Sequence, residues 1–413
     1  MRIAIVNEGL GYPANAGNRI RTLNLLLPLA RRHEITYICR GVADRAESDA
    51  AASFYADHGI RTIITADHAA EKSGVGFYAQ LLRNVLSPLP FSIAAHNSPL
   101  VRQAVLTLAA TERIDAWQIE TLSYADVLRR RDARTVIMAH NVESLIWQRL
   151  YETERHPVKR GYIRHQWRKY ERFEAYALAQ ATRVVAVTEE DAALFTRRFG
   201  IARVDVVDNG VDLDFFESVA GARKPDRARI LFLGSLDWRP NIDSLELLIR
   251  HILPDVRKSI PDAVLDIVGR NPSPSLARLA GTVEGVTVHA NVPDVRPFLA
   301  RASVMAVPLR IGGGSRLKIL EAAASGVPVV STRIGSEGLA FVNGRDIVNV
   351  DDVNDMATAL VEAILQPDRA ASFAAHALSV ARARYAWDGL AARLERIWEE
   401  AAATGARQFK RPA

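Results

Sequence analysis

Cysteine is nearly absent from this sequence: Cys39 is the single thiol in 413 residues. One cysteine cannot form a disulfide within the chain, which excludes a disulfide-stapled extracellular scaffold and favours a reducing compartment. Apolar runs near the roughly 20 residues of a membrane span are also lacking, and the first apolar stretch meets Glu8 too early for a signal peptide. We therefore expect a cytoplasmic protein, with peripheral contact at the inner face of a membrane as an open alternative.

A large excess of one charge is lacking as well. Lysine and arginine number 53 against 47 acidic residues, which gives a formal net charge of +6. This balance is too small to indicate nucleic acid as a partner, but it suits a phosphate-bearing ligand or an anionic membrane surface. The length favours two domains, each large enough for a core of its own.

The most informative stretch joins a strand, a glycine loop, a helix and a second strand. Ser303–Leu309 predicts a buried strand, apolar residues at helical spacing predict a helix from Leu317 to Ala324, and Val327–Ser331 predicts the next strand. Glycines let backbone N–H groups converge on one point, and the helix N-terminus behind them favours an anion. The predicted phosphate-binding loop consists of Gly312, Gly313, Gly314 and Ser315.

Charged side chains follow this loop at the start of the predicted helix. Arg316 and Lys318 oppose the helix dipole there, so an anionic ligand is a physical reason for their presence. Glu321 lies three residues after Lys318, where its carboxylate could accept hydrogen bonds from a ribose diol. The alternative is an ordinary helix with a solvated basic end.

The same stretch resembles the carboxyl-terminal signature of glycosyltransferase family 4, the retaining glycosyltransferases with the GT-B fold. Glu321-Ala322-Ala323 and the segment from Gly326 to Val330 match the second half of that signature. The family usually carries another Glu where this chain has Gly313, and that Glu contacts the donor sugar. A subgroup with G-G-G-(S/T)-R-L-K-x-L-E-A has the same substitution, and Gly312–Ala322 fits it throughout.

The resemblance implies an α/β fold class: GT-B, with two Rossmann-like doubly wound domains facing an interdomain cleft. Strands and helices alternate twice along the chain, which favours the same architecture. We expect an acceptor-binding domain at 1–210, a linker at 211–228 and a nucleotide-sugar-binding domain at 229–384. Residues 385–413 are expected to form a helix that crosses back to the N-terminal domain, followed by a basic tail.

A strand at Arg2–Asn7, a long glycine-bearing loop and a helix at Asn18–Arg32 open the chain. The dinucleotide fingerprint needs a tighter loop and an acidic residue after the next strand, which instead ends in Cys39-Arg40, so a nicotinamide cofactor is not expected. The resemblance implies that Gly17 lies near the donor phosphates. The alternative for Gly17 is a turn that begins the helix.

His140 follows the predicted strand Arg134–Ala139, in the sequence His140-Asn141-Val142-Glu143. Ligands of open α/β sheets bind at the carboxyl ends of strands, which is where this imidazole is expected. In the resembling family a histidine at this place hydrogen-bonds the donor sugar or organises the reacting centre. A structural histidine is the alternative.

The resemblance also places the diphosphate and the base. Many members carry an Arg and a Lys where this chain has Ser235 and Pro240, so Arg316 and Lys318 are expected to replace that pair. The backbone at Arg270 and Val292, after two predicted strands, is expected to hold the base.

Metal ligands are not expected. Asp212-Leu213-Asp214 superficially matches the metal-binding D-x-D of another glycosyltransferase fold, but it lies at the expected interdomain crossing. The nucleotide-diphosphate sugar is the donor substrate, and no separate cofactor is expected.

Two further segments bear on partners. Phe77–Pro90 has apolar residues at helical spacing, which predicts core packing first and a helix on a bilayer surface second. His156–Glu174 is basic and interleaved with aromatic residues. It predicts a long helix with solvated charges first, a membrane surface second and nucleic acid a distant third.

Together these features predict a retaining glycosyltransferase. By family analogy it moves a sugar from a nucleotide-diphosphate sugar to a glycan, lipid-linked or small-molecule acceptor, in the biosynthesis of cell-surface polysaccharide or glycoconjugate. His140, Arg316 and Lys318 are the expected catalytic residues. Two alternatives remain open: a nucleotide-sugar epimerase of the same fold, and a non-catalytic nucleotide-sugar-binding subunit, which Gly313 in place of Glu would favour.

Overall fold

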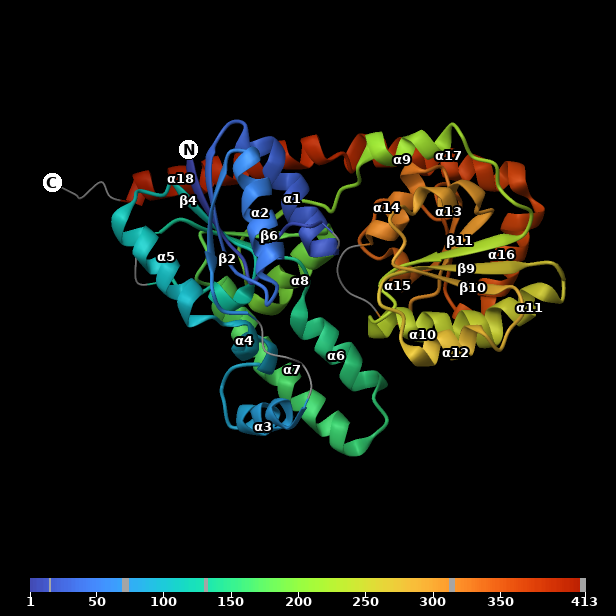
Figure 1. The fold of residues 1–413 in the computed structure, drawn as a ribbon, viewed down its shortest axis with the longest axis horizontal. Coiled ribbons are helices and arrows are strands. Elements are labelled where there is room, and N and C mark those ends of the chain that lie inside the picture. Colours follow the sequence, from blue (N-terminus) through green and yellow to red (C-terminus); the bar gives the residue numbers. More distant parts are fainter. Residues whose placement is uncertain (15, 69–73, 130–132, 312–315, 409–413) are drawn as a thin grey trace. The chain divides into compact units, whose positions relative to one another are not determined.

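The computed structural model describes all residues except 15, 69–73, 130–132, 312–315 and 409–413, and it leaves out the side chains of 74–78 and 405–408. The chain divides into two compact units (Figure 1). The first unit contains Met1–Asp208 and Asp388–Ala413, and the second contains Asn209–Gly312 and Arg316–Trp387. Residues 211–228, which we expected to form a linker, lie within the second unit and include a helix.

A sheet of seven parallel strands forms the centre of the first unit, in the order β3-β2-β1-β4-β5-β6-β7. The chain starts in the middle of the sheet, winds outward to β3, returns to β4 and winds outward on the other side, as in a Rossmann fold. The strands are β1 (Arg2–Val6), β2 (Glu34–Arg40), β3 (Ile60–Thr65), β4 (Ala116–Ile119), β5 (Thr135–Ala139), β6 (Arg183–Ala186) and β7 (Val204–Val206).

Helices connect these parallel strands, because a parallel strand pair needs a crossover. They are α1 (Gly17–Ala30), α2 (Arg45–Asp57), α3 (Gly74–Val85), α4 (Phe91–His96), α5 (Pro99–Thr111), the 3₁₀ turn η1 (Leu122–Tyr124), α6 (Glu143–Thr153), α7 (Pro157–Leu178), α8 (Glu189–Phe199) and the C-terminal α18 (Trp387–Gln408). Helix α8 shows how local sequence sets the bounds. Thr188 accepts a hydrogen bond from the Asp191 N–H at its start, and Gly200, with φ of 69°, ends it.

The second unit repeats the same winding in a sheet of six parallel strands, ordered β10-β9-β8-β11-β12-β13. Both faces of this sheet are covered. Along β8, Leu231 and Leu233 join one apolar cluster, while Ile230 and Phe232 join the cluster on the other face. The strands are β8 (Arg229–Leu233), β9 (Val264–Gly269), β10 (Val286–Ala290), β11 (Val304–Val307), β12 (Val329–Thr332) and β13 (Val348–Val350).

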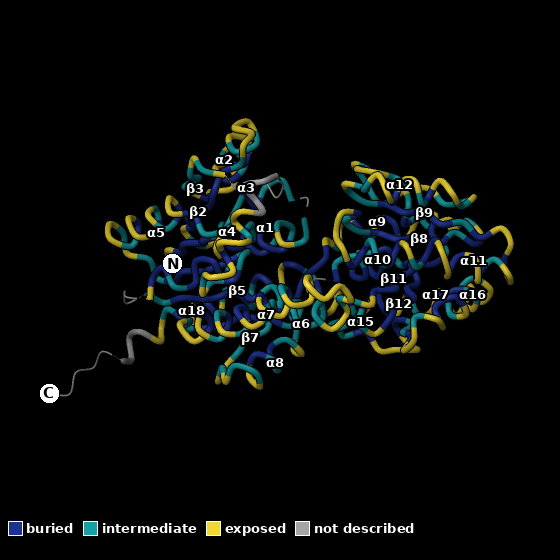
Figure 2. The backbone as a smooth tube through the Cα atoms, turned by 90° about the horizontal axis from the view of Figure 1, so that it is seen from below, coloured by how far each residue is buried: buried dark blue, intermediate teal, exposed yellow. Residues whose placement is uncertain are grey.

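Figure 2 shows both sheets as largely buried. The sheet of the second unit is surrounded by the helices of that unit. They are α9 (Leu213–Ala220), α10 (Arg239–Leu247), the π-helical turn η2 (Leu248–Ile252), α11 (Leu253–Arg257), α12 (Pro274–Ala280), α13 (Arg296–Arg301), α14 (Leu317–Ala324), α15 (Arg333–Ser336), the 3₁₀ turn η3 (Val353–Asp355), α16 (Met356–Leu365) and α17 (Pro367–Arg384).

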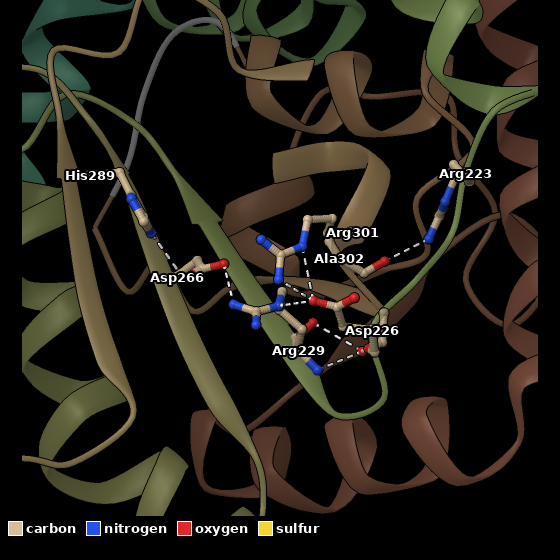
Figure 3. Close-up of polar contacts among 8 residues, drawn as sticks. Arg223, Asp226, Arg229, Asp266, His289, Arg301 and Ala302 are labelled. Carbon is tan, nitrogen blue, oxygen red and sulfur yellow. Dashed lines mark hydrogen bonds and ion pairs between the residues drawn. The ribbon is translucent and has the colours of Figure 1, made fainter. Parts of the chain in front are cut away.

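An ion network fastens the segment before β8 to the second sheet, and Figure 3 shows its members. Arg229 donates to Asp226 (Nε to Oδ2, 2.8 Å) and to Asp266 on β9 (Nη1 to Oδ2, 2.7 Å). His289 on β10 lies 3.1 Å from the other oxygen of Asp266, and Arg301 pairs with Asp226 at 2.6 Å. Side-chain contacts of this network therefore join β8, β9 and β10 to one another and to the loop before β8.

The predicted fold class of two Rossmann-like parallel sheets is confirmed, and most elements begin and end within two residues of their predicted bounds. The prediction for Phe77–Pro90 as core was wrong at its exposed positions. Leu82, Val85 and Leu86 are 73%, 40% and 92% exposed. Polar bonds from α7 hold this segment instead: Gln166 donates to Asn84, and His165 bonds to the carbonyl of Val85.

The long helix predicted at His156–Glu174 is confirmed as α7, with Tyr170 buried and Arg164 and Arg172 exposed. Across the described residues, none of the helices combines the length and apolarity needed to cross a membrane. Asp212, from the D-x-D match, caps α9 by accepting the Phe215 N–H at 3.0 Å.

Candidate active site

Lys318 lies at the carboxyl edge of the second sheet, beside the glycine that follows β8. Its Nζ donates to Oδ1 of Asn241 at 2.9 Å and lies 4.5 Å from the centre of the Phe232 ring. A Cβ atom at Gly234 would come within 2.9 Å of this Nζ, so a side chain there would collide with the ammonium group. Gly234 also has φ of 157°, which disfavours other residues. The ammonium is therefore fixed above the end of β8.

Asn241 is the residue that orients this ammonium group. Its Oδ1 accepts from Lys318, and its Nδ2 donates to the carbonyl of Ser235 at 2.8 Å. Asn241 is 6% exposed and lies in the first turn of α10. The sequence analysis did not single it out. The adjacent position, Pro240, is one of the two at which this chain lacks the cations of the resembling family.

Burial shifts the pKa values of two charged side chains on α14. Desolvation, together with the nearby Arg316 charge, lowers the pKa of Lys318 to about 7, and Glu321 opposes this effect. Desolvation raises the pKa of the Glu321 carboxyl to about 7 as well, partly opposed by Lys318. An anion placed beside Lys318 would stabilise its protonated form, so the site favours a ligand that supplies negative charge.

Arg316 lies immediately before α14 and is 6% exposed. Its Nη2 donates to the carbonyl of Ile334 at 2.8 Å and lies 3.5 Å from Oε2 of Glu337. These contacts orient the guanidinium toward α15. Its charge also acts on Lys318, since it contributes to the lowered pKa of that lysine. The predicted phosphate-binding loop, Gly312, Gly313, Gly314 and Ser315, lies outside the described residues.

The loops that follow β8, β9 and β10 are tied together at the same edge. The Leu236 N–H donates to the carbonyl of Arg270 at 2.8 Å, and the Asn271 N–H donates to Oδ1 of Asn291 at 3.2 Å. Asn271 and Asn291 both adopt positive φ, 55° and 52°. Arg270 and Val292, the predicted base-binding positions, flank these asparagines, and Val292 also packs against the core. The structure thus brings the predicted base loops to the sheet edge at which the Lys318 ammonium lies.

His140 lies on the first unit, directly after β5, at the carboxyl edge of that unit's sheet. Its Nε2 is 2.9 Å from Oε2 of Glu120, a buried carboxylate directly after β4. Thr22 on α1 donates to the same oxygen at 2.9 Å. Burial alone would raise the pKa of Glu120, but the hydrogen bond and charge of His140 and the bonds from Gln118 and Thr22 hold that pKa below its ordinary value. Sequence analysis missed Glu120, because a single acidic residue after a strand carries no motif.

Gly17 is the first residue of α1, in the loop that follows β1. The two arginines behind it are engaged elsewhere in the first unit. Arg19 lies 3.4 Å from Glu47, and Arg21 is buried, donating to the carbonyls of Val207 and Asp208 at 2.6 Å each. Gly17 thus begins a helix at the carboxyl edge, which fits both the phosphate and the turn interpretation.

Two sheets wound alike, with polar side chains gathered where their strands end, define the class of α/β proteins that bind ligands at the carboxyl edges of parallel sheets. Comparison with family models identifies the particular family. The model described as Glycosyltransferase Family 4 matches residues 19–215, and the model described as Glycosyl transferases group 1 matches residues 227–366. The chain belongs to this family of glycosyltransferases.

A relative with a known activity matches about half of the chain. The chain is 31% identical over 239 residues to a GDP-mannose-dependent alpha-(1-6)-phosphatidylinositol monomannoside mannosyltransferase of Mycolicibacterium smegmatis. The match covers 52% of this chain and 61% of that protein, so the chain spans about three fifths of its length.

Solved structures show the fold over nearly the whole chain. Sucrose-phosphate synthase from Thermosynechococcus elongatus aligns with a TM-score of 0.73 at 17% identity, covering 98% of this chain and all of the other. Anabaena HepE, in complex with UDP and glucose, aligns with a TM-score of 0.68 at 14% identity, covering 97% of this chain and all of HepE. The GT-B fold class predicted from sequence is thereby confirmed.

Proposed function

We propose that this chain is a retaining glycosyltransferase that uses a nucleotide-diphosphate sugar as donor. The observation that carries the proposal is the environment of Lys318, whose partly desolvated ammonium is held by Asn241 above the end of β8. A diphosphate is the ligand that such a group favours, because it restores the charge that burial disfavours. Family membership supports the same donor class, as does the UDP in the complex of Anabaena HepE.

The chemistry assigned to these residues is electrostatic. The bond between the anomeric carbon and the donor phosphate oxygen breaks, and its electron pair stays on the diphosphate. The acceptor hydroxyl forms the new bond on the same face, and its proton passes to that phosphate oxygen. Lys318 and Arg316 stabilise the negative charge that develops on the leaving diphosphate. Glu321 orients the ribose and His140 holds the sugar in this assignment, with the base against the backbone at Arg270 and Val292.

The acceptor class is proposed as a glycan, lipid-linked or small-molecule hydroxyl, in the biosynthesis of cell-surface polysaccharide or glycoconjugate. The relative from Mycolicibacterium smegmatis supports a lipid-linked acceptor, since its name is that of a phosphatidylinositol monomannoside mannosyltransferase. No metal and no separate cofactor is part of this proposal, and nucleic acid is not a proposed partner. All three expectations stay predictions.

We place the protein in the cytoplasm, in peripheral contact with the membrane. The surface that supports this contact consists of Leu82, Val85 and Leu86 beside the exposed cations Arg83 and Arg164. Hydrogen bonds join α7, which carries Arg164, to the α3 segment, the stretch from Leu82 to Leu86 that carries the apolar residues and Arg83. Exposed leucines next to cations suit the interface of an anionic bilayer.

A donor screen followed by a product assay tests the proposed function. Thermal unfolding of the full chain is measured with UDP-, GDP-, ADP- and dTDP-sugars, and the true donor raises the melting temperature, because it binds the folded state. That donor is then incubated with and without a panel of hydroxyl acceptors. Release of the nucleoside diphosphate that depends on an acceptor supports the transferase. An isomerised donor formed without acceptor would establish the epimerase, and binding without turnover on any acceptor would establish a binding subunit.

A further inference from the structure

A continuous row of buried hydrogen bonds runs from the C-terminal helix to His140. The indole Nε1–H of Trp398 on α18 donates to Oε1 of Gln118 on β4 at 2.7 Å. The Nε2 of Gln118 donates to Oε1 of Glu120, and His140 bonds to Oε2 of the same carboxylate at 2.9 Å. Trp398 and Gln118 are fully buried, and Glu120 is 5% exposed. Four side chains from three elements, up to 280 residues apart, therefore form one row.

The direction of each bond in this row follows from the indole at one end and from the ionised carboxylate of Glu120. An indole N–H can only donate, so the Gln118 oxygen must accept from Trp398 and its amide nitrogen must point to Glu120. Glu120 keeps a low pKa and accepts from Gln118, Thr22 and His140. The ring of His140 must then carry a hydrogen on Nε2, which leaves Nδ1 as the acceptor atom of the neutral ring.

Exposure distinguishes Glu120 from His140, the last member of the row. The side chain of Glu120 is 3% exposed, whereas that of His140 is 23% exposed at the carboxyl edge of the sheet. Burying a carboxylate costs folding free energy unless donors satisfy it, and an apolar core residue would avoid that cost. A buried carboxylate behind a partly exposed imidazole is the arrangement by which proteins fix a ring and its tautomer. The position of the Glu120 carboxylate behind His140 therefore indicates a role other than core packing.

We propose that Glu120 is a positioning residue for His140, and that α18 sets its orientation through Trp398 and Gln118. This inference rests on the proposed function, in which His140 contacts the donor sugar. It assigns a role in turnover to the last helix of the chain, which carries no motif. The indole also contacts His33, whose ring centre lies 5.9 Å from the indole's in a T-shaped arrangement and which pairs with Glu395 on α18.

Other charged and titratable groups face this row and must be held constant in any test. Arg21 on α1 attracts Glu120, and the hydroxyls of Tyr37 on β2 and Tyr55 on α2 interact electrostatically with the same carboxylate. Glu143, at the start of α6, interacts with His140. None of these four is altered in the variants below.

Three variants of the full chain test the proposal by kinetics: Glu120→Gln, Trp398→Phe and, as a matched control, Trp117→Phe. Trp117 is also a buried indole on β4, adjacent to Gln118 but not part of the row. Glu120→Gln should lower kcat by roughly 10- to 100-fold and Trp398→Phe by a smaller factor, with the KM for the donor nearly unchanged. Trp117→Phe should retain native kcat.

Nitrogen NMR of the His140 ring gives a readout that needs no substrate. The native ring should carry hydrogen on Nε2, and Glu120→Gln should shift the population toward Nδ1–H, with a smaller shift for Trp398→Phe. Native ring signals in both variants, or equal kcat losses in Trp398→Phe and Trp117→Phe, would overturn the positioning role. If the native chain shows no transfer at all, the proposed function fails, while the ring signals still decide the positioning role.

Discussion

At the scale of single residues, Lys318 is the cation that we propose serves a diphosphate site from which the usual cations are missing. Ser235 and Pro240 stand where many members of the family have Arg and Lys, and the Lys318 ammonium lies beside Gly234 at the end of β8. Asn241 holds it by a single charge-assisted bond of 2.9 Å. Its pKa of about 7 gives the site a pH dependence that can be measured.

Donor affinity should fall as pH rises above 7. The pKa of free Lys318 is lowered to about 7, and a bound diphosphate raises it again, so binding takes up a proton at higher pH. The association constant should therefore be level below pH 7 and decrease by about tenfold per unit above it. Calorimetry with the intact nucleotide sugar measures this, since its diphosphate diester does not titrate in this range.

The matched control for this pH dependence is Lys318→Arg, because a guanidinium stays protonated throughout the range. This variant should bind the donor with a nearly flat profile. A native-like slope in the arginine variant would show that another group titrates. Glu321, whose pKa is also raised to about 7, is the first group to replace in that case, by Glu321→Gln.

The sequence could predict part of this site and not the rest. Lys318 and Glu321 sit in a contiguous motif, so spacing and resemblance were enough to name them. Asn241 lies 77 residues from Lys318, and Glu120 lies 20 residues from His140. Each is a lone polar residue whose role depends on how the chain folds back, and no local pattern carries that information.

At the scale of elements, the predictions were strongest where one physical rule governs. Buried strands such as Val264–Gly269 are short apolar runs between turn residues, and Gly326, with φ of 66°, follows α14 at the position where a glycine commonly closes a helix. The α3 segment departs from its prediction because helical spacing of apolar residues does not say what the stripe faces. Hydrogen bonds from α7 hold this segment, and its apolar side chains stay exposed.

Breaking the ion network beneath β8 should destabilise the second unit. Asp266→Asn removes the charge that pairs with Arg229 and His289 and leaves the partly buried guanidinium with Asp226 alone. We expect a loss of about 2 kcal/mol in the free energy of unfolding, below the range for fully buried pairs because Arg229 is partly solvated. Denaturant unfolding measures this loss.

The control for the network is Arg301→Gln, which removes a cation from the same network at a more exposed position. Its ion pair with Asp226 should contribute less than about 1 kcal/mol. Equal losses in the free energy of unfolding for Asp266→Asn and Arg301→Gln would show that burial of the Asp266 ion pairs adds nothing to stability.

The α3 and α7 surface should bind anionic vesicles. The native chain should sediment with vesicles of phosphatidylglycerol and phosphatidylcholine and much less with phosphatidylcholine alone. The double variant Leu82→Ser and Leu86→Ser should reduce binding by at least roughly tenfold, because two leucines lose their apolar contact. Leu365→Ser, at an exposed leucine on α16 of the second unit, is the control. Equal vesicle binding by the double variant and the control would rule out this surface.

At the scale of the whole molecule, the two units share one winding order, and this is what the alternation of strands and helices in the sequence predicted. The repeated order brings the polar loops of each unit to the carboxyl edge of its sheet. His140 and Glu120 occupy that edge in the first unit, and Lys318 occupies it in the second. Donor and acceptor identity depend on loop backbone and on residues without motifs, which is why the sequence leaves them open.

The proposed function requires Lys318 to stabilise the diphosphate as it leaves the donor sugar. Steady-state turnover of Lys318→Ala, with the donor and acceptor found by the screen, tests it most directly. We expect kcat/KM to fall by about 100- to 1,000-fold while the thermal unfolding of the variant stays close to native. Turnover of Lys318→Ala near the native rate would contradict it.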